Sequence, residues 1–226
     1  PIEPALKPSS MGYNCLRRLY YDFYRVVPDR EFSGRELMIF KTGSNLHEML
    51  QGLLGRAGAL IMYFDQDKDY YELEFVVEDR GLCIKKGKVD GIIKCDGKLY
   101  ILEIKTINSR KFKDLTKPLK EHTVQGEIYR YLFVKCLNEG KYKNMAELDG
   151  FTSVESVIYL YLCKDTGEMK EFEVAYDESV ISEVIDKVAT FLDFALNKVL
   201  PPKNKDECYF CTFKNKCSKD FNPVKE

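Results

Sequence analysis

Apolar and polar residues alternate along this chain with two distinct spacings, and these spacings predict its main elements. Helical spacing predicts helices over residues 11–24, 35–57, 119–137 and 178–200, the last of which is stopped by Pro201-Pro202. Strand-like runs occupy residues 71–77, 82–95, 99–106, 153–163 and 169–176. The order of helices and strands favours an α/β fold with a mixed central β-sheet flanked by helices.

An Asp-Gly dipeptide between two apolar runs predicts a β-hairpin near the middle of the chain. If Asp96-Gly97 is a two-residue turn, the register that it sets continues outward until Asp90 lies directly opposite Glu103. Side chains so placed have Cβ atoms about 4.5–5.5 Å apart on one face of the sheet. Strand periodicity puts Lys105 on the same face as Glu103. The sequence therefore predicts two carboxylates and a lysine at one point.

Two carboxylates beside a lysine are suited to metal-dependent cleavage of phosphodiesters. A hard cation such as Mg²⁺ usually takes only one or two carboxylates from the protein, and it polarises the phosphate and activates water. In such a site Lys105 would position or deprotonate the attacking water, or offset charge on the phosphate. Taken alone, Asp90, Glu103 and Lys105 fit equally well as exposed hairpin residues.

Composition places few limits on the function. The chain has 226 residues, of which 45% are hydrophobic and 31% charged, so one domain over residues 1–226 is the simplest organisation. No apolar run approaches the ~18 residues that a membrane span needs, and the first residues lack the features of a signal peptide. We therefore expect a cytoplasmic protein that does not enter a membrane.

One segment is strongly basic although the net charge of the whole chain is only −1. Residues 105–120 contain a single acid, Asp114, among several basic side chains. These basic residues are Lys105, Arg110, Lys111, Lys113, Lys117 and Lys120. Such a segment either follows a phosphate backbone or forms a solvated loop, and the residues alone leave both interpretations open.

Three motifs, in the appropriate order along the chain, resemble the PD-(D/E)xK nucleases and, within them, the RecB-like branch. The matching residues are Gly43-Ser44-Asn45-Leu46-His47 for the G-x3-H element, Asp90 with Glu103-Ile104-Lys105 for the catalytic core, and Gln125-Gly126-Glu127-Ile128-Tyr129 for the Q-x3-Y element. Helical spacing places Gln125 and Tyr129 one turn apart on one face. Val89 replaces the proline of the family motif, a position that supplies no ligand. The resemblance implies a restriction-endonuclease-like core.

The eight cysteines are of two kinds. Four stand alone in apolar or strand-like surroundings, which is typical of small buried hydrophobic residues: Cys83, Cys95, Cys136 and Cys163. The tail contains Cys208-x2-Cys211-x5-Cys217, and Cys15 is the natural fourth ligand for a tetrahedral metal or a cubane cluster. Spacing alone leaves zinc and iron–sulfur open.

One N-terminal cysteine followed by a C-terminal C-x2-C-x5-C resembles the iron–sulfur nucleases, namely Cas4 and the AddB and Dna2 nuclease domains. This resemblance implies a [4Fe–4S] cluster that joins Cys15 to the tail over residues 203–226. It also implies a Cas4-like, Mg²⁺- or Mn²⁺-dependent DNA exonuclease that acts on single-stranded ends. The expected partners are DNA and proteins of CRISPR spacer acquisition, or of DNA repair and recombination.

The resemblance assigns roles to individual residues. His47, Asp90, Glu103 and the Ile104 carbonyl would hold the metal, and Lys105 would act on the attacking water. Gln125 and Tyr129 would orient the lysine or the substrate. The phosphate backbone would be bound by Arg17, Arg18, Arg110, Lys111, Lys113 and Lys117. Three alternatives stay open: an endonuclease of the same superfamily for structured or double-stranded DNA, a non-catalytic adaptor that binds DNA ends, and a zinc-stapled module.

Overall fold

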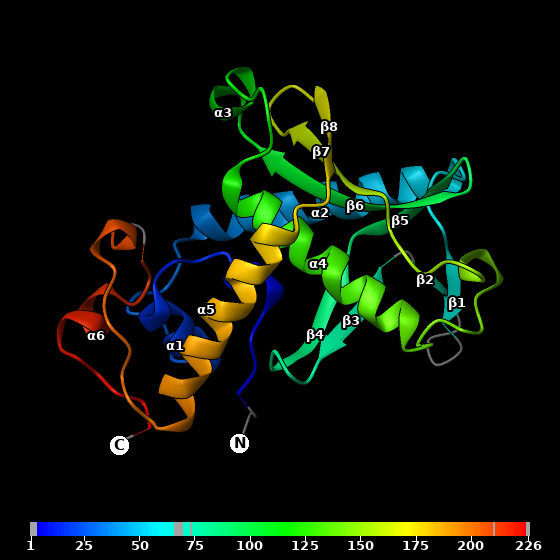
Figure 1. Cartoon of the computed structure of the whole chain (residues 1–226). Coiled ribbons are helices and arrows are strands. Elements are labelled where there is room, and N and C mark those ends of the chain that lie inside the picture. Colours follow the sequence, from blue (N-terminus) through cyan, green and yellow to red (C-terminus); the bar gives the residue numbers. More distant parts are fainter. Residues whose placement is uncertain (1–3, 66–69, 73, 210, 225–226) are drawn as a thin grey trace.

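The protein is described by a computed structural model that covers residues 4–65, 70–72, 74–209 and 211–224 (Figure 1). Its α-helices are α1 (Leu16–Phe23), α2 (Gly34–Arg56), α3 (Ser109–Lys113), α4 (Lys120–Asn138), α5 (Glu178–Leu196) and α6 (Lys214–Ser218). Its strands are β1 (Tyr63–Asp65), β2 (Tyr70–Glu72), β3 (Phe75–Asp79), β4 (Ile84–Val89), β5 (Gly91–Cys95), β6 (Lys98–Ile107), β7 (Ser156–Cys163) and β8 (Met169–Ala175). Short 3₁₀ turns occupy Pro8–Ser10, Ala146–Leu148 and Lys205–Glu207.

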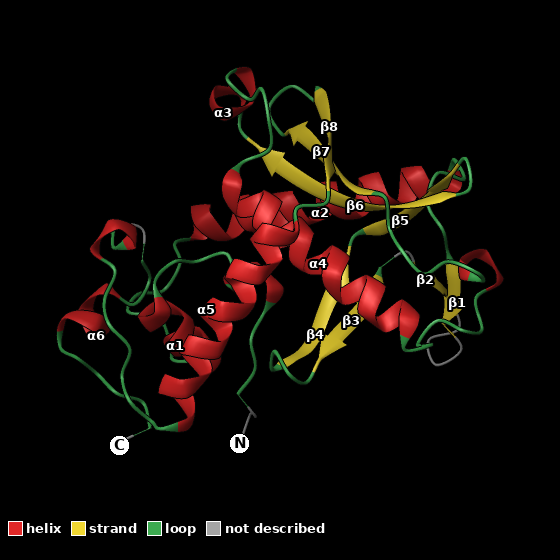
Figure 2. Ribbon diagram, viewed as in Figure 1, coloured by secondary structure: helices red, strands yellow, loops and turns green. Residues whose placement is uncertain are grey.

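A four-stranded mixed sheet lies at the centre of the fold. Its strand order is β5-β6-β7-β8, with β6 parallel to β7 and the other two pairs antiparallel. Helices α2 and α4 lie on opposite sides of this sheet (Figure 2). Leu50 of α2 packs in a small core with Leu102 and Ile104, whereas Ile128 of α4 belongs to the large core that contains Ile101. The predicted α/β class, with a mixed sheet flanked by helices, is therefore confirmed.

The predicted hairpin forms between β5 and β6. Asp96 and Gly97 have φ values of 49° and 73°, the left-handed pair that a two-residue type I′ turn requires. The predicted register holds until Gly91, which pairs with Leu102. Asp90 lies in a bend between β4 and β5, so the strand expected over residues 82–95 is two strands. In the described ladder, the expected pairing of Asp90 with Glu103 is therefore wrong, although the turn that predicted it is correct.

Helix α2 begins where its sequence provides a capping box. Ser33 Oγ accepts a hydrogen bond from the Glu36 amide, and the Glu36 carboxylate accepts one from the Ser33 amide. The helix matches the expected range, and several of its apolar residues are exposed: Leu37, Ile39, Phe40, Met49 and Leu53. Gly43 packs near Thr106, close to the end of β6. The first part of the helix is exposed because it extends past that strand.

The two ends of the chain pack against each other. Tyr21 Oη donates a hydrogen bond of 2.9 Å to the Phe221 carbonyl, and Tyr24 Oη donates one of 2.9 Å to the Ala195 carbonyl. The helix expected over residues 11–24 starts only at Leu16, because the carbonyls of Met11 and Tyr13 turn toward Lys187 Nζ on α5. No helix in the described ranges combines the length and apolar character needed to cross a membrane.

Candidate active site

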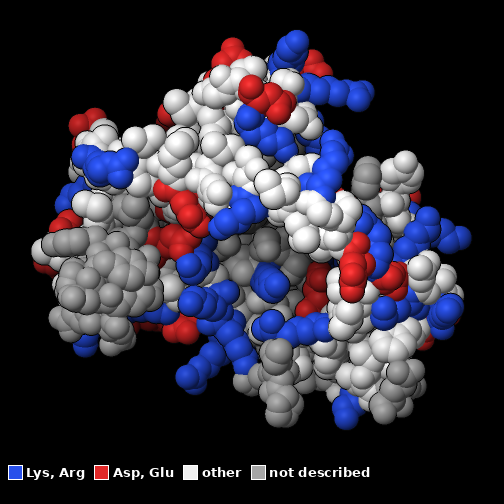
Figure 3. All heavy atoms as spheres, turned by 180° about the vertical axis from the view of Figure 1, so that it is seen from behind, with Lys and Arg blue, Asp and Glu red and all other residues white. Residues whose placement is uncertain are grey.

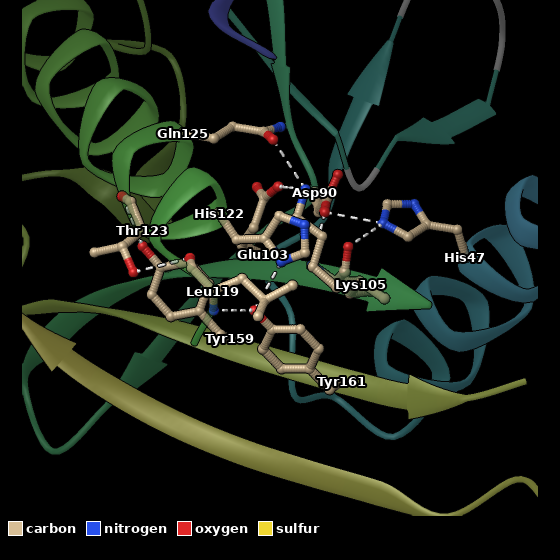
Figure 4. Close-up of polar contacts among 11 residues, drawn as sticks. His47, Asp90, Glu103, Lys105, Leu119, His122, Thr123, Gln125, Tyr159 and Tyr161 are labelled. Atoms are coloured by element: carbon tan, nitrogen blue, oxygen red, sulfur yellow. Dashed lines mark hydrogen bonds and ion pairs between the residues drawn. The ribbon is translucent and has the colours of Figure 1, made fainter. Parts of the chain in front are cut away.

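Strand β6 presents Glu103 and Lys105 toward helix α4. Alternation along the strand turns Leu102 and Ile104 toward α2, so the two charged side chains face the opposite side. Lys105 Nζ lies 2.5 Å from Glu103 Oε1 and donates a hydrogen bond of 3.0 Å to Gln125 Oε1 (Figure 4). The lysine that the sequence places beside the acids is thus held between a strand carboxylate and a helix amide.

Asp90, His47 and the Ile104 backbone meet at the end of the small core. His47 Nε2 lies 3.0 Å from Asp90 Oδ2 and 3.0 Å from the Ile104 carbonyl oxygen. The Ile104 amide donates a hydrogen bond of 2.8 Å to Asp90 Oδ2. Gln51, one turn after His47, donates a hydrogen bond of 2.6 Å to the Asp90 carbonyl. The bend at Asp90 therefore directs its carboxylate toward β6 and α2 without a cross-strand pair.

Burial and like charge dominate the electrostatics of this site. Burial, and then the nearby Asp90 carboxylate, raise the pKa of Glu103 to about 8, while Lys105 and His47 oppose the rise. Burial by itself would lower the pKa of His47, but Asp90, the Ile104 carbonyl and Glu103 raise it on balance. A positive charge placed among these groups would relieve the repulsion between the two carboxylates.

The available donor atoms fit a hard divalent cation. Glu103 Oε2 is buried and has no hydrogen-bond partner among the described residues, and beside it stand a second carboxylate, a backbone carbonyl and an imidazole. Carboxylate and carbonyl oxygens are the preferred ligands of Mg²⁺ and Mn²⁺. In the part of the chain that is described, no three His, Cys, Asp or Glu side chains already stand in metal-binding geometry. His47 and Asp90 are instead hydrogen-bonded to each other.

Helix α4 carries Gln125 and Tyr129 on the face that meets this site. Tyr129 is largely buried, and burial raises its pKa, while a side-chain hydrogen bond with Gln125 opposes the rise. Gly126 allows the close approach of α4 to the sheet, because a Cβ there would lie only 2.1 Å from Tyr159 Oη. That hydroxyl donates a hydrogen bond of 3.1 Å to the Thr123 carbonyl. The glycine inside the Q-x3-Y segment thus fixes the depth at which Gln125 lies.

His122, Gln51 and Tyr161 are site residues that the sequence did not single out. His122 Nδ1 lies 2.7 Å from Tyr161 Oη, which also accepts a hydrogen bond of 3.1 Å from the Leu119 amide. Burial, with Lys105 and Lys111 nearby, lowers the pKa of His122 to about 3, so its imidazole is neutral and shares a hydrogen bond with the Tyr161 hydroxyl. No local sequence pattern marks these three residues, because their contacts form only when α2, α4 and β7 pack together in the folded protein.

The four clustered cysteines meet at the other end of the molecule. Cys15, Cys208, Cys211 and Cys217 all line one cavity of about 290 Å³ between α1 and the tail. Within the described residues, no three of them are gathered closely enough to hold a single ion. Four other cysteines were expected to be buried. Cys136 and Cys163 are buried and Cys83 is half-buried. Cys95 is exposed, because it borders the β5–β6 turn.

The residues expected to bind the phosphate backbone separate into two groups. Arg110, Lys111, Lys113 and Lys117 are all exposed, on α3 and the loop after it. On the face shown in Figure 3, Lys and Arg atoms gather around a hollow at the centre. Arg17 is wrong as a backbone contact: it is 7% exposed, donates a hydrogen bond of 2.7 Å to the Pro201 carbonyl and pairs with Asp220. Arg18 lines the cysteine cavity and stacks on Tyr13, 3.5 Å from the ring centroid.

Solved structures share this fold. The crystal structure of SSO0001 matches with a TM-score of 0.51 and 21% identity, covering 96% of this chain and 87% of that one. The alkaline exonuclease LHK-Exo from Laribacter hongkongensis matches with a TM-score of 0.52 and 11% identity, over 86% of this chain and 89% of that one. LHK-Exo in complex with dAMP gives a TM-score of 0.55 and 12% identity with the same coverage. At these identities the likeness shows the fold alone.

The sequence itself decides the family. No curated protein matches it, but residues 22–218 match the sequence profile of the PD-(D/E)XK nuclease superfamily. That range contains His47, Asp90, Glu103, Lys105 and Gln125, the residues whose contacts are described above. By its sequence, this chain belongs to the PD-(D/E)XK nuclease superfamily.

Proposed function

We propose that this protein is a Cas4-like, Mg²⁺- or Mn²⁺-dependent DNA exonuclease that acts on single-stranded DNA ends. One observation carries the proposal: His47 Nε2 lies 3.0 Å from Asp90 Oδ2 and 3.0 Å from the Ile104 carbonyl oxygen, next to a buried Glu103. The unsatisfied Glu103 Oε2 supplies a further ligand atom. His47, Asp90, Glu103 and the Ile104 carbonyl would therefore hold the metal.

The chain's own residues would organise the reaction around that metal. When bound, the cation would polarise the scissile phosphate and activate water. Lys105, held by Glu103 and Gln125, would keep its ammonium group beside the phosphate and the attacking water. Tyr129 would fix the side chain of Gln125, with which it forms a hydrogen bond. The exposed basic residues of α3 and the following loop would bind the phosphate backbone away from the reacting bond.

Site variants test the catalytic proposal. Asp90→Ala and Lys105→Ala should abolish metal-dependent cleavage of an end-labelled single strand while the circular dichroism spectrum stays unchanged. Lys98→Ala is the matched control, because Lys98 lies on the same strand, is exposed and contacts Glu155 on the surface. Wild-type cleavage by either site variant would overturn the assignment.

The same assay separates an exonuclease from an endonuclease. A closed single-stranded circle has no end, so an exonuclease should leave it intact in Mg²⁺ and in Mn²⁺. Linearising the circle should then restore degradation. Cleavage of the closed circle at a rate close to that of the linear strand would favour an endonuclease of the same superfamily. Failure to cleave either substrate with both metals would favour a non-catalytic adaptor that binds DNA ends.

We also propose that residues 1–226 form one nuclease domain in which Cys15 and the 203–226 tail hold a [4Fe–4S] cluster. A cavity of about 290 Å³ supports this choice over zinc, because one zinc ion needs four thiolates drawn to within about 2.3 Å of a single point. A cubane cluster fills more space and takes one thiolate at each of its four irons. The Cas4-like proposal makes CRISPR acquisition or recombination proteins the expected partners.

Metal analysis of anaerobically purified protein tests the cluster. We expect a brown preparation with about four irons and four sulfides per chain. Cys208→Ser should lose colour and iron, whereas Cys95→Ser should keep both, because Cys95 is exposed beside a surface turn. A colourless preparation with one zinc per chain would favour the zinc-stapled alternative.

A further inference from the structure

The first half of α2 carries apolar side chains in solvent on the same helix as the candidate metal ligand His47. Phe40 is 51% exposed and precedes His47 by seven residues, close to two helical turns. It therefore lies on nearly the same helix face, about 10 Å along the axis from His47. This face continues past the end of β6 without a covering element among the described residues, since the helix residues 34–42 are all exposed or half-buried. A substrate strand in the site would pass close to it.

Phe40 forms an aromatic pair with Phe32, and Arg30 holds Phe32 in place beside helix α2. The Phe32 and Phe40 ring centroids are 5.1 Å apart with the rings at 90°, and the Arg30 guanidinium carbon lies 5.5 Å from the Phe32 centroid. Arg30 forms two hydrogen bonds of 2.9 and 2.7 Å with the Glu36 carboxylate, which also caps the helix through Ser33. The edge-to-face arrangement leaves ring faces available to a further planar group.

We propose that Phe32 and Phe40 form a stacking platform for an unpaired base of the DNA substrate, about one or two nucleotides from the scissile phosphate. The inference rests on the proposed function and specifies how a single strand is recognised. Every base has a π-face, so aromatic stacking binds single strands without a sequence requirement. Paired bases stack within their own duplex and cannot engage the platform in this way. The platform therefore favours unpaired ends over duplex DNA.

Geometry favours a base over a protein partner. A protein docking on α2 would use the apolar residues around the helix, including Met38, which is 68% exposed and lies nine residues from His47 on the opposite face. The aromatic pair instead lies on the face that leads into the site, with the Arg30 guanidinium beside it. A guanidinium next to an aromatic ring widens the flat surface on which a base can stack.

A thermodynamic cycle between the protein and the DNA tests the platform. The probes are a fluorescein-labelled oligodeoxythymidylate and a series in which one abasic residue moves inward from the end, with binding measured in EDTA by anisotropy. Phe40→Ala should weaken binding of the intact strand roughly fivefold to a hundredfold. One abasic position should weaken binding to the wild type by a similar factor and have no further effect on Phe40→Ala. Phe40→Tyr should bind like the wild type, and Phe40→Leu should not.

Met38→Ala is the matched control, because it removes an exposed apolar side chain from the other face of the same helix. It should bind all strands like the wild type. Equal effects of every abasic position on wild type and Phe40→Ala, or wild-type binding by Phe40→Leu, would overturn the platform. So would a change from oligomer to monomer in Phe40→Ala with no change in the cycle, which would identify a protein interface. Cleavage by the wild type and its loss in Asp90→Ala test the proposed function separately.

Discussion

Gly126 on α4 is the position at which one methyl group should disturb the site most. A Cβ there would lie 2.1 Å from Tyr159 Oη, 2.7 Å from Cζ and 2.9 Å from Cε1. Bringing the shortest of these contacts to the 3.0 Å below which Cβ atoms are essentially never found requires a shift of about 0.9 Å. Tyr159 is completely buried and is tied to Thr123, so it has little room to move away. We expect α4 to move instead.

That movement would reach the site directly, because Gln125 precedes the glycine. Its 3.0 Å hydrogen bond to Lys105 Nζ would lengthen beyond hydrogen-bonding distance. A displacement of about 1 Å in a positioning group can cost roughly 100-fold in rate, and overpacking of this kind typically destabilises the fold by about 1–3 kcal/mol. For Gly126→Ala we therefore expect a loss of about 100-fold in cleavage rate and about 1–3 kcal/mol in the free energy of unfolding.

The measurements are initial rates of cleavage of an end-labelled single strand and urea-induced unfolding. Tyr159→Phe removes the hydroxyl that the new methyl would strike, so the double variant should recover part of the rate and stability lost in Gly126→Ala. Gly34→Ala is the matched control, since a Cβ at the start of α2 meets no atom within 4 Å. If Gly126→Ala kept wild-type rate and stability, or if Tyr159→Phe gave no recovery, the close approach of α4 would not position Gln125.

Two further predictions concern buried polar groups near the same helix. Burial raises the pKa of Glu127 from its ordinary 4.5 to about 7. The protonated side chain therefore contributes stability below pH ~4.5, and this contribution is lost as the pH rises through about 7. The free energy of unfolding should fall by roughly 3 kcal/mol over this range. Urea unfolding of Glu127→Gln should lack most of this pH dependence, and parallel profiles for the two proteins would contradict the assignment. Tyr161→Phe removes the hydroxyl that forms hydrogen bonds with His122 and the Leu119 amide. This change should lower the free energy of unfolding by about 1–3 kcal/mol. An unchanged unfolding curve would show that these bonds add nothing.

Local signals predicted the hairpin and its strand well because all the determinants lie within a few residues. Asp96 and Gly97 adopt the two left-handed conformations of their turn, and the turn then fixes the register of β5 and β6. Strand alternation correctly placed Glu103 and Lys105 together, and their contact of 2.5 Å follows from it. No interaction with a distant segment is needed for either result.

Contacts between distant segments could not be predicted in this way. Asp90 leaves the ladder because its carboxylate binds His47 and the Ile104 amide, and its carbonyl binds Gln51 from α2. Nothing in the residues around Asp90 encodes those partners. Arg17 has the composition of a phosphate contact, yet the tail that follows Pro201 covers it. In both cases the side chain's role depends on its contacts with segments that are remote in the sequence.

Helix α2 shows why an apolar pattern alone did not determine which of its faces is buried. Its apolar residues spread around the helix, but only the second half has a sheet beneath it, where Leu50 packs with Leu102 and Ile104. His47 lies within that anchored half, and its distance of 3.0 Å to the Ile104 carbonyl is set by the same packing. Phe40 is carried by the same rigid helix two turns earlier. The docking of α2 therefore fixes the candidate metal ligand and the proposed platform relative to each other.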